Sequence, residues 1–165
     1  MSGSFVMNTA AACALFLILV SPQSQAAEDE VLEALESFIA AFENGDIEAM
    51  ESSFANNAVT FPRSIMAHEY DQDIDVSKYR RVRGIDPQMR ELIDSLKRSG
   101  RERPYLDIEP VDLEIQIIGD AAVATFHLVG GARLGRRTFV LALIDGAWKI
   151  VHLHASNVYG SRQQH

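Results

Sequence analysis

The sequence contains little cysteine and no excess of positive charge. Its 165 residues include a single cysteine, Cys13, so no disulfide can form within the chain, although many domains of oxidising compartments have none. The formal net charge of −8 argues against nucleic-acid binding, which usually requires a basic face. A glycine-rich phosphate loop, a nucleophile elbow and a cysteine–histidine zinc pattern are also missing. What remains is the composition of an ordinary folded domain, 47% apolar and 23% charged, at a length that suits one domain.

Charged side chains are absent before Glu28, and the longest apolar run is short. That run, Ala10 to Val20, is too short to span a bilayer, which takes ~20 apolar residues, but its length fits a signal-peptide core. Ser24-Gln25-Ala26 resembles a small-x-small cleavage site. We therefore predict a signal peptide over 1–26, a domain over 27–165, a periplasmic or secreted location, and no stable membrane anchor after cleavage. No Lys or Arg precedes the core, so the alternative is a disordered or mis-started N-terminus.

After this leader, the residue pattern predicts helices first and strands later. Apolar residues at helical spacing recur in the first helix, and Asp46 and Asp86 stand where helix N-caps are expected. Later segments alternate and are separated by short turns, which favours an antiparallel meander and an α+β fold. The expected helices are 28–44, 47–54 and one starting at Pro87, and the expected strands are 58–61, 106–118, 121–129, 136–144 and 148–158.

The last strand carries the most distinctive residues. Asp145-Gly146 forms a hairpin turn, and alternate residues of a strand share a face. Alternation would give one face a row of side chains that begins with two apolar residues and continues with two histidines and a hydroxyl. Such a row suits either a pocket wall or a polar strand end. The residues of that row are Trp148, Ile150, His152, His154 and Ser156.

Two motifs resemble one superfamily. The stretch Trp148 to Ser156 is similar to the last strand of nuclear-transport-factor-2-like (NTF2-like) domains, closest to the SnoaL-like branch and to the association domain of calcium/calmodulin-dependent kinase. Phe54-Ala55-Asn56-Asn57-Ala58-Val59 resembles the signature at which the second helix of that superfamily gives way to the first strand. The resemblance implies a cone-shaped α+β fold. Three helices from the N-terminal half would pack on a curved, mostly antiparallel sheet, with one apolar cavity and a homodimer formed through the open sheet face.

The leading functional hypothesis is binding of a small apolar or weakly anionic ligand in that cavity, without a cofactor or a metal. One alternative is an enzyme of the cyclase, isomerase or hydratase type with His152 or His154 as acid/base. Another is an oligomerisation or partner-docking module. The candidate ligand-binding residues are Phe38, Phe42, Phe54, Phe61, Trp148, His152, His154 and Arg137.

Motifs that would indicate a metal site, a calcium loop or a catalytic base are incomplete or missing. Metal binding by His152 and His154 would need a third ligand such as His127. Asp71, Asp73 and Asp75 begin like a calcium loop, but the glycine and glutamate that the loop needs are absent. Ketosteroid isomerase, another member of the superfamily, uses an aspartate base that would fall near Phe61, where this chain has none.

Overall fold

The computed structural model describes residues 22–61, 82–130 and 133–159. The predicted core of the signal peptide and the acidic stretch 71–75 lie outside these residues. The elements are arranged along the chain in the order α1 (Pro22–Asn44), α2 (Ile47–Ser52), β1 (Phe54–Phe61), β2 (Val82–Arg83), α3 (Pro87–Arg98), β3 (Val111–Ile118), β4 (Ala121–Gly130), β5 (Arg133–Ile144) and β6 (Ala147–Tyr159).

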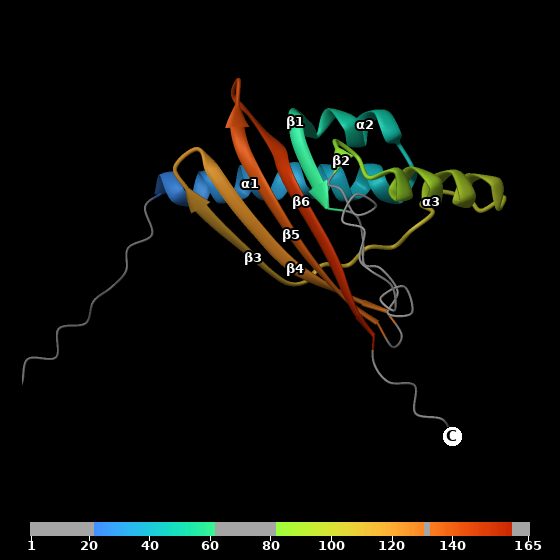
Figure 1. The fold of residues 1–165 in the computed structure, drawn as a ribbon. Helices are drawn as coiled ribbons and strands as arrows, with labels where there is room; N and C mark the ends of the chain where they lie inside the picture. The colour runs from blue at the N-terminus through green and yellow to red at the C-terminus, as the bar shows by residue number, and fades with distance from the viewer. Residues whose placement is uncertain (1–21, 62–81, 131–132, 160–165) are drawn as a thin grey trace, which may run out of the picture.

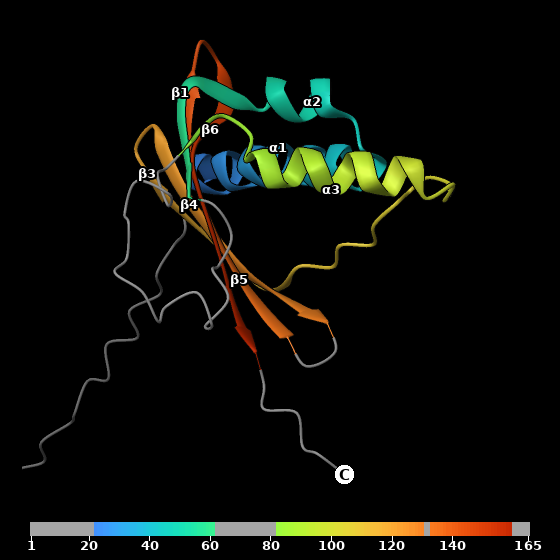
Figure 2. The same ribbon diagram turned by 45° about the vertical axis from the view of Figure 1, so that its right-hand side comes forward.

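The strands form one six-stranded sheet in the order β2-β1-β6-β5-β4-β3. Only β1 and β6 run parallel, and all other neighbours are antiparallel. The helices lie on one side of the curved sheet (Figure 1 and Figure 2). The predicted α+β fold is therefore confirmed. The inner face of the sheet is the face toward the helices, and the outer face is the opposite one.

Helix α1 begins at Pro22, earlier than the expected start at Glu28. Proline is accommodated in the first turn of a helix because its missing N–H has no intrahelical partner there. The apolar stripe expected from helical spacing is buried, with Val31, Leu35 and Phe38 at 0–2% exposure. The indole of Trp148 donates a 3.2 Å hydrogen bond to Glu30, which ties α1 to β6. No described helix is long and apolar enough to cross a membrane.

The region after α1 departs from the expected boundaries. Asp46 caps α2 by accepting a 3.0 Å hydrogen bond from the Ala49 N–H, as expected. However, α2 ends at Ser52 and β1 begins at Phe54, where a helix and then an Asn56-Asn57 turn were expected. Phe54 already pairs with β6, and an irregular register between Phe54 and Val59 accommodates the two asparagines within the strand.

A β-bulge in β6 overturns the expected alternation of the last strand. Val140 pairs with His152, but Leu141 pairs with Ile150, so Val151 is an extra residue that the partner strand does not match. A shift of one residue exchanges the two faces of a strand. The inner face therefore changes from Ile150 to Leu153, which are 1% and 3% exposed. Consequently His152 and His154 lie on the outer face, and the single row expected from Trp148 to Ser156 does not form.

The core is built around Phe38 of α1. Its ring stacks near Phe42 and makes edge contacts with Phe54 and Phe139, at centroid distances of 5.5–6.5 Å. Phe126 of β4 stacks on Phe139 at 5.6 Å. Such aromatic pairs stabilise a core beyond the area that they bury. The cluster fixes α1 against the inner face at the middle of the sheet.

The connection between α3 and β3 is held against the end of α1. Glu43 accepts hydrogen bonds from the N–H groups of Tyr105 and Ile108, at 2.7 Å through its carbonyl and 2.6 Å through its carboxylate. These bonds explain why β3 begins at Val111 and not at Leu106, as alternation had suggested. They also place Ile108 beside the space between α1 and α3.

Candidate functional site

A cavity opens between α1, α3 and the inner face of the sheet. The volume of its enclosed part is about 80 Å³. The empty space increases to about 680 Å³ when the open mouth is included. The enclosed part suits a small apolar group, while the mouth has room for a longer or more polar end. The residues that border it are Phe38, Ile39, Phe42, Thr60, Phe61, Asp86, Gln88, Met89, Leu92, Ile108, Phe126, Leu128, Arg137, Phe139, Leu153 and Ala155.

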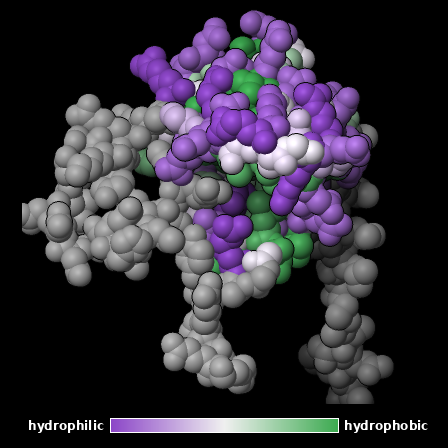
Figure 3. Space-filling model, turned by 90° about the vertical axis from the view of Figure 1, so that its right-hand side faces the viewer, coloured by the Kyte–Doolittle hydropathy of each residue, from purple (hydrophilic) through white to green (hydrophobic). Residues whose placement is uncertain are grey.

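The walls of the cavity are mostly apolar. Phe38 and Phe42 come from α1, Phe126 and Phe139 from β4 and β5, and Leu153 from β6. Leu153 reaches the cavity because the Val151 bulge turns it to the inner face. Figure 3 shows hydrophobic surface in a hollow beneath a rim of hydrophilic residues. This arrangement favours a ligand whose body is hydrocarbon.

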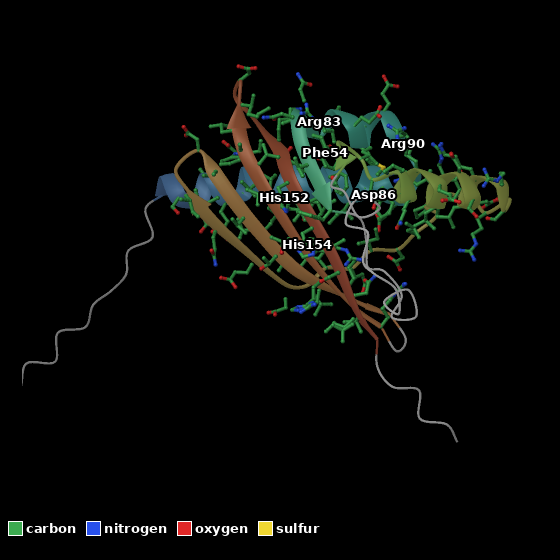
Figure 4. All side chains as sticks on the ribbon, viewed as in Figure 1. Phe54, Arg83, Asp86, Arg90, His152 and His154 are labelled. Carbon is green, nitrogen blue, oxygen red and sulfur yellow. The ribbon has the colours of Figure 1, made fainter. Side chains whose placement is uncertain are left out.

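Two polar side chains at the cavity are almost fully buried. Thr60 is 1% exposed, and its hydroxyl donates a 2.6 Å hydrogen bond to the Gly84 carbonyl, which joins β1 to the loop before α3. Asp86 is 4% exposed, and its Oδ1 accepts a 2.9 Å hydrogen bond from the Gln88 N–H as the cap of α3. Figure 4 shows Asp86 beside the start of α3. The sequence identified Asp86 as a helix cap only, because capping chemistry does not reveal burial.

Arg137 of β5 brings a permanent positive charge to the cavity. Its Nη1 donates to the Ser156 carbonyl at 3.1 Å and lies 3.4 Å from the Asn157 Oδ1. The guanidinium lies over Gly135, where an added Cβ would stand only 3.0 Å from Nη1. The glycine and the end of β6 thus hold the guanidinium close to the sheet.

The predicted histidines lie away from this cavity. The Phe61 ring at the end of β1 makes edge contacts with His152 and His154 at centroid distances of 5.7 and 6.1 Å. Figure 4 shows both histidines along β6, and the bulge at Val151 places them on the outer face. His127 lies on β4, two strands from β6, and its Nδ1 is 3.6 Å from an Asp112 carboxylate oxygen. Within the described chain, no group of three or more His, Cys, Asp or Glu side chains could hold a metal ion.

The other predicted ligand-binding residues divide into two groups. Phe38, Phe42, Phe61 and Arg137 border the cavity. Phe54 and Trp148 do not border it: Phe54 packs in the core against Phe38, and Trp148 is 9% exposed at the α1–β6 contact. Sequence spacing placed Phe38, Phe54 and Trp148 inside the molecule, but it did not reveal that Phe61 is 43% exposed and could not separate cavity walls from core.

The fold is that of NTF2-like proteins. The association domain of C. elegans CaMKII superposes with a TM-score of 0.59 at 16% identity, over 82% of this chain and 99% of that domain. An NTF2-like protein of unknown function from Pseudomonas putida KT2440 gives 0.57 at 21% identity, over 86% and 94%. Another from Shewanella baltica OS155 gives 0.55 at 17% identity, over 81% and 95%.

A match to a protein-family model assigns the chain more specifically than these structural similarities do. The SnoaL-like domain model matches residues 31–160, and the chain belongs to that family. The match covers α1 from its first buried residue to the end of β6. No curated protein matches the sequence.

Proposed function

We propose that the protein is exported and binds a small, apolar or weakly anionic ligand in the cavity between α1, α3 and the sheet. The observation that carries the proposal is the combination of aromatic walls with one guanidinium, that of Arg137. Burying the hydrocarbon body of a ligand against such walls is favourable by roughly 25 cal/mol per Å². Arg137 adds a charge that suits a carboxylate or another oxygen anion.

Export is supported by the leader sequence and is compatible with α1, whose first residues overlap the end of the leader. Cleavage after Ala26 would remove the first residues of α1, which begins at Pro22. The first fully buried residue of α1 is Val31, so the apolar contacts between the helix and the sheet would remain.

A homodimer formed through the outer face of the sheet is part of the same proposal. Phe61 is 43% exposed next to the two histidines of β6. Farther along that face, Val129, Leu134 and Val158 are paired in register on three neighbouring strands, with exposed fractions of 68%, 37% and 46%. A row of exposed apolar side chains on a sheet face favours burial against a partner.

Native mass spectrometry of the protein recovered from an exporting host tests these points together. We expect a dimer whose subunits begin near Ala27, with a co-purified small molecule whose mass defines its class. A full-length monomer without an adduct, and without binding to phenylacetate in calorimetry, would contradict the proposal.

A pair of variants tests the cavity itself. Ala155 borders the cavity on the inner face of β6, whereas its neighbour His154 is exposed on the outer face. Ala155→Phe should fill part of the cavity and weaken phenylacetate binding about 10-fold or more, while His154→Phe should leave the affinity unchanged. Equal affinities for the two variants would place the ligand elsewhere.

A further inference from the structure

Asp86 has one carboxylate oxygen in use and one available. Oδ1 accepts the hydrogen bond from the Gln88 N–H, and the start of a helix favours a negative charge at this position. Among the described residues, no hydrogen bond or ion pair is made to Oδ2. The carboxylate is therefore fixed in position by the helix but only half satisfied.

The second oxygen keeps some open surface. The residue as a whole is 4% exposed, yet no buried side-chain oxygen in the described part of the chain lacks a hydrogen-bond partner. Because Oδ2 has no such partner within the described ranges, it must touch open space, and the open space that Asp86 borders is the cavity. A carboxylate oxygen that has lost most of its water attracts a donor strongly.

Arg137 contributes the opposite charge to the same cavity. Asp86 comes from the loop before α3, and Arg137 from β5. Both residues are described, and no ion pair joins one to the other. A ligand between them can meet both only if it carries an acceptor at one end and a donor at the other.

We propose that Asp86 Oδ2 accepts a hydrogen bond from a hydroxyl group of the ligand, so that the preferred ligand is a small apolar carboxylic acid that also carries a hydroxyl. This inference rests on the proposed ligand-binding function and names its ligand class. A ligand without a donor would cover the Asp86 carboxylate and leave it unsatisfied, which is unfavourable. Asp86 is then the residue that separates hydroxylated acids from plain ones.

Two acids that differ by one hydroxyl provide the test. Calorimetric titration of the native protein with 4-hydroxyphenylacetate and phenylacetate should show roughly 10-fold tighter binding of the hydroxylated acid, because hydrogen bonds to charged groups are among the stronger ones. Asp86→Asn retains an Oδ1 acceptor for the Gln88 N–H but replaces Oδ2 by an uncharged amide. The preference should fall to about 2-fold or less, because phenylacetate then no longer covers an unsatisfied charge.

Two further variants separate binding from folding. Asp86→Ser keeps a capping hydroxyl and removes the second oxygen, so it should also lose the preference. Asp46→Asn alters the exposed cap of α2, which has the same chemistry but does not border the cavity, and should keep the preference. If the native protein binds both acids equally, or Asp86→Asn keeps the full preference, the role of Asp86 is wrong while the ligand-binding function stands. If neither acid binds, both are wrong.

Discussion

At the scale of single residues, the cavity is apolar except where a few side chains are held by specific bonds. Thr60 uses its hydroxyl to join β1 to the loop before α3, and Asp86 uses Oδ1 to begin α3. Arg137 is placed by the end of β6 and by the absence of a side chain at Gly135. Each polar group is thus fixed before a ligand arrives, which reduces the entropy lost on binding.

Gly135→Ala tests the placement of Arg137. The new Cβ would stand 3.0 Å from Nη1, so the guanidinium must move away from the sheet. We expect phenylacetate affinity to fall severalfold, with a melting temperature close to that of the native protein, because the side chain of Arg137 can shift while the strand is retained. Gly130→Ala is the matched control, since nothing lies within 4 Å of an added Cβ there. Equal loss of affinity in both variants would show that Gly135 has no special role.

At the scale of elements, the bulge at Val151 decides which side chains of β6 reach the cavity. Trp148 and Ile150 are buried before it, and Leu153 is buried after it. Strict alternation would have directed His152 inward and Leu153 outward. One inserted residue therefore gives the cavity an aliphatic wall and gives the outer face its histidines.

Deletion of Val151 should leave this arrangement in place. Without Val151, Ile150 can still pair with Leu141 and His152 with Val140, so regular alternation keeps Ile150 and Leu153 inward and His152 outward. We expect the free energy of unfolding, measured with urea, to fall by no more than about 1 kcal/mol. A fall of about 2–5 kcal/mol, the cost of losing a buried leucine, would contradict the assignment of the bulge.

The sequence predicted elements better than faces. Helical spacing identified the buried stripe of α1, and turn residues located the hairpin before β6, because both signals are local. A bulge depends on the register with a partner strand, which the sequence of β6 alone does not contain. The burial of Asp86 was missed for a similar reason: it depends on how α3 docks against β1 and the sheet. The predicted site thus contained Arg137 but placed the histidines on the wrong face for the cavity.

At the scale of the whole molecule, the two faces of the sheet have different surroundings. The inner face is covered by the helices (Figure 1) and encloses the cavity. The outer face carries exposed apolar side chains. A chain with a net charge of −8 would repel its own copies unless such a face supplied apolar contact. The proposed function therefore assigns one face to the ligand and one to assembly.

Leu134→Asp tests assembly. Leu134 is the middle residue of the exposed row formed with Val129 and Val158, so a carboxylate there would be buried without a partner in a dimer. We expect light scattering after size exclusion to show a shift from dimer to monomer, with phenylacetate binding retained. Leu143→Asp, at a similar exposure of 38% on the same strand but outside the row, is the control. A dimer that survives Leu134→Asp would place the interface elsewhere.

The parallel pairing of β1 with β6 has a consequence for how the chain reaches this structure. Strands β2 to β5 and helix α3 come between β1 and β6 in the chain, yet β6, the last strand of the domain, is the main neighbour of β1. Contacts between such distant segments form slowly because a long loop must close first. During synthesis, β1 therefore cannot form this pairing until almost the entire polypeptide has emerged. Late completion of the sheet would suit the proposed export, because passage through a narrow translocation channel requires an unfolded chain.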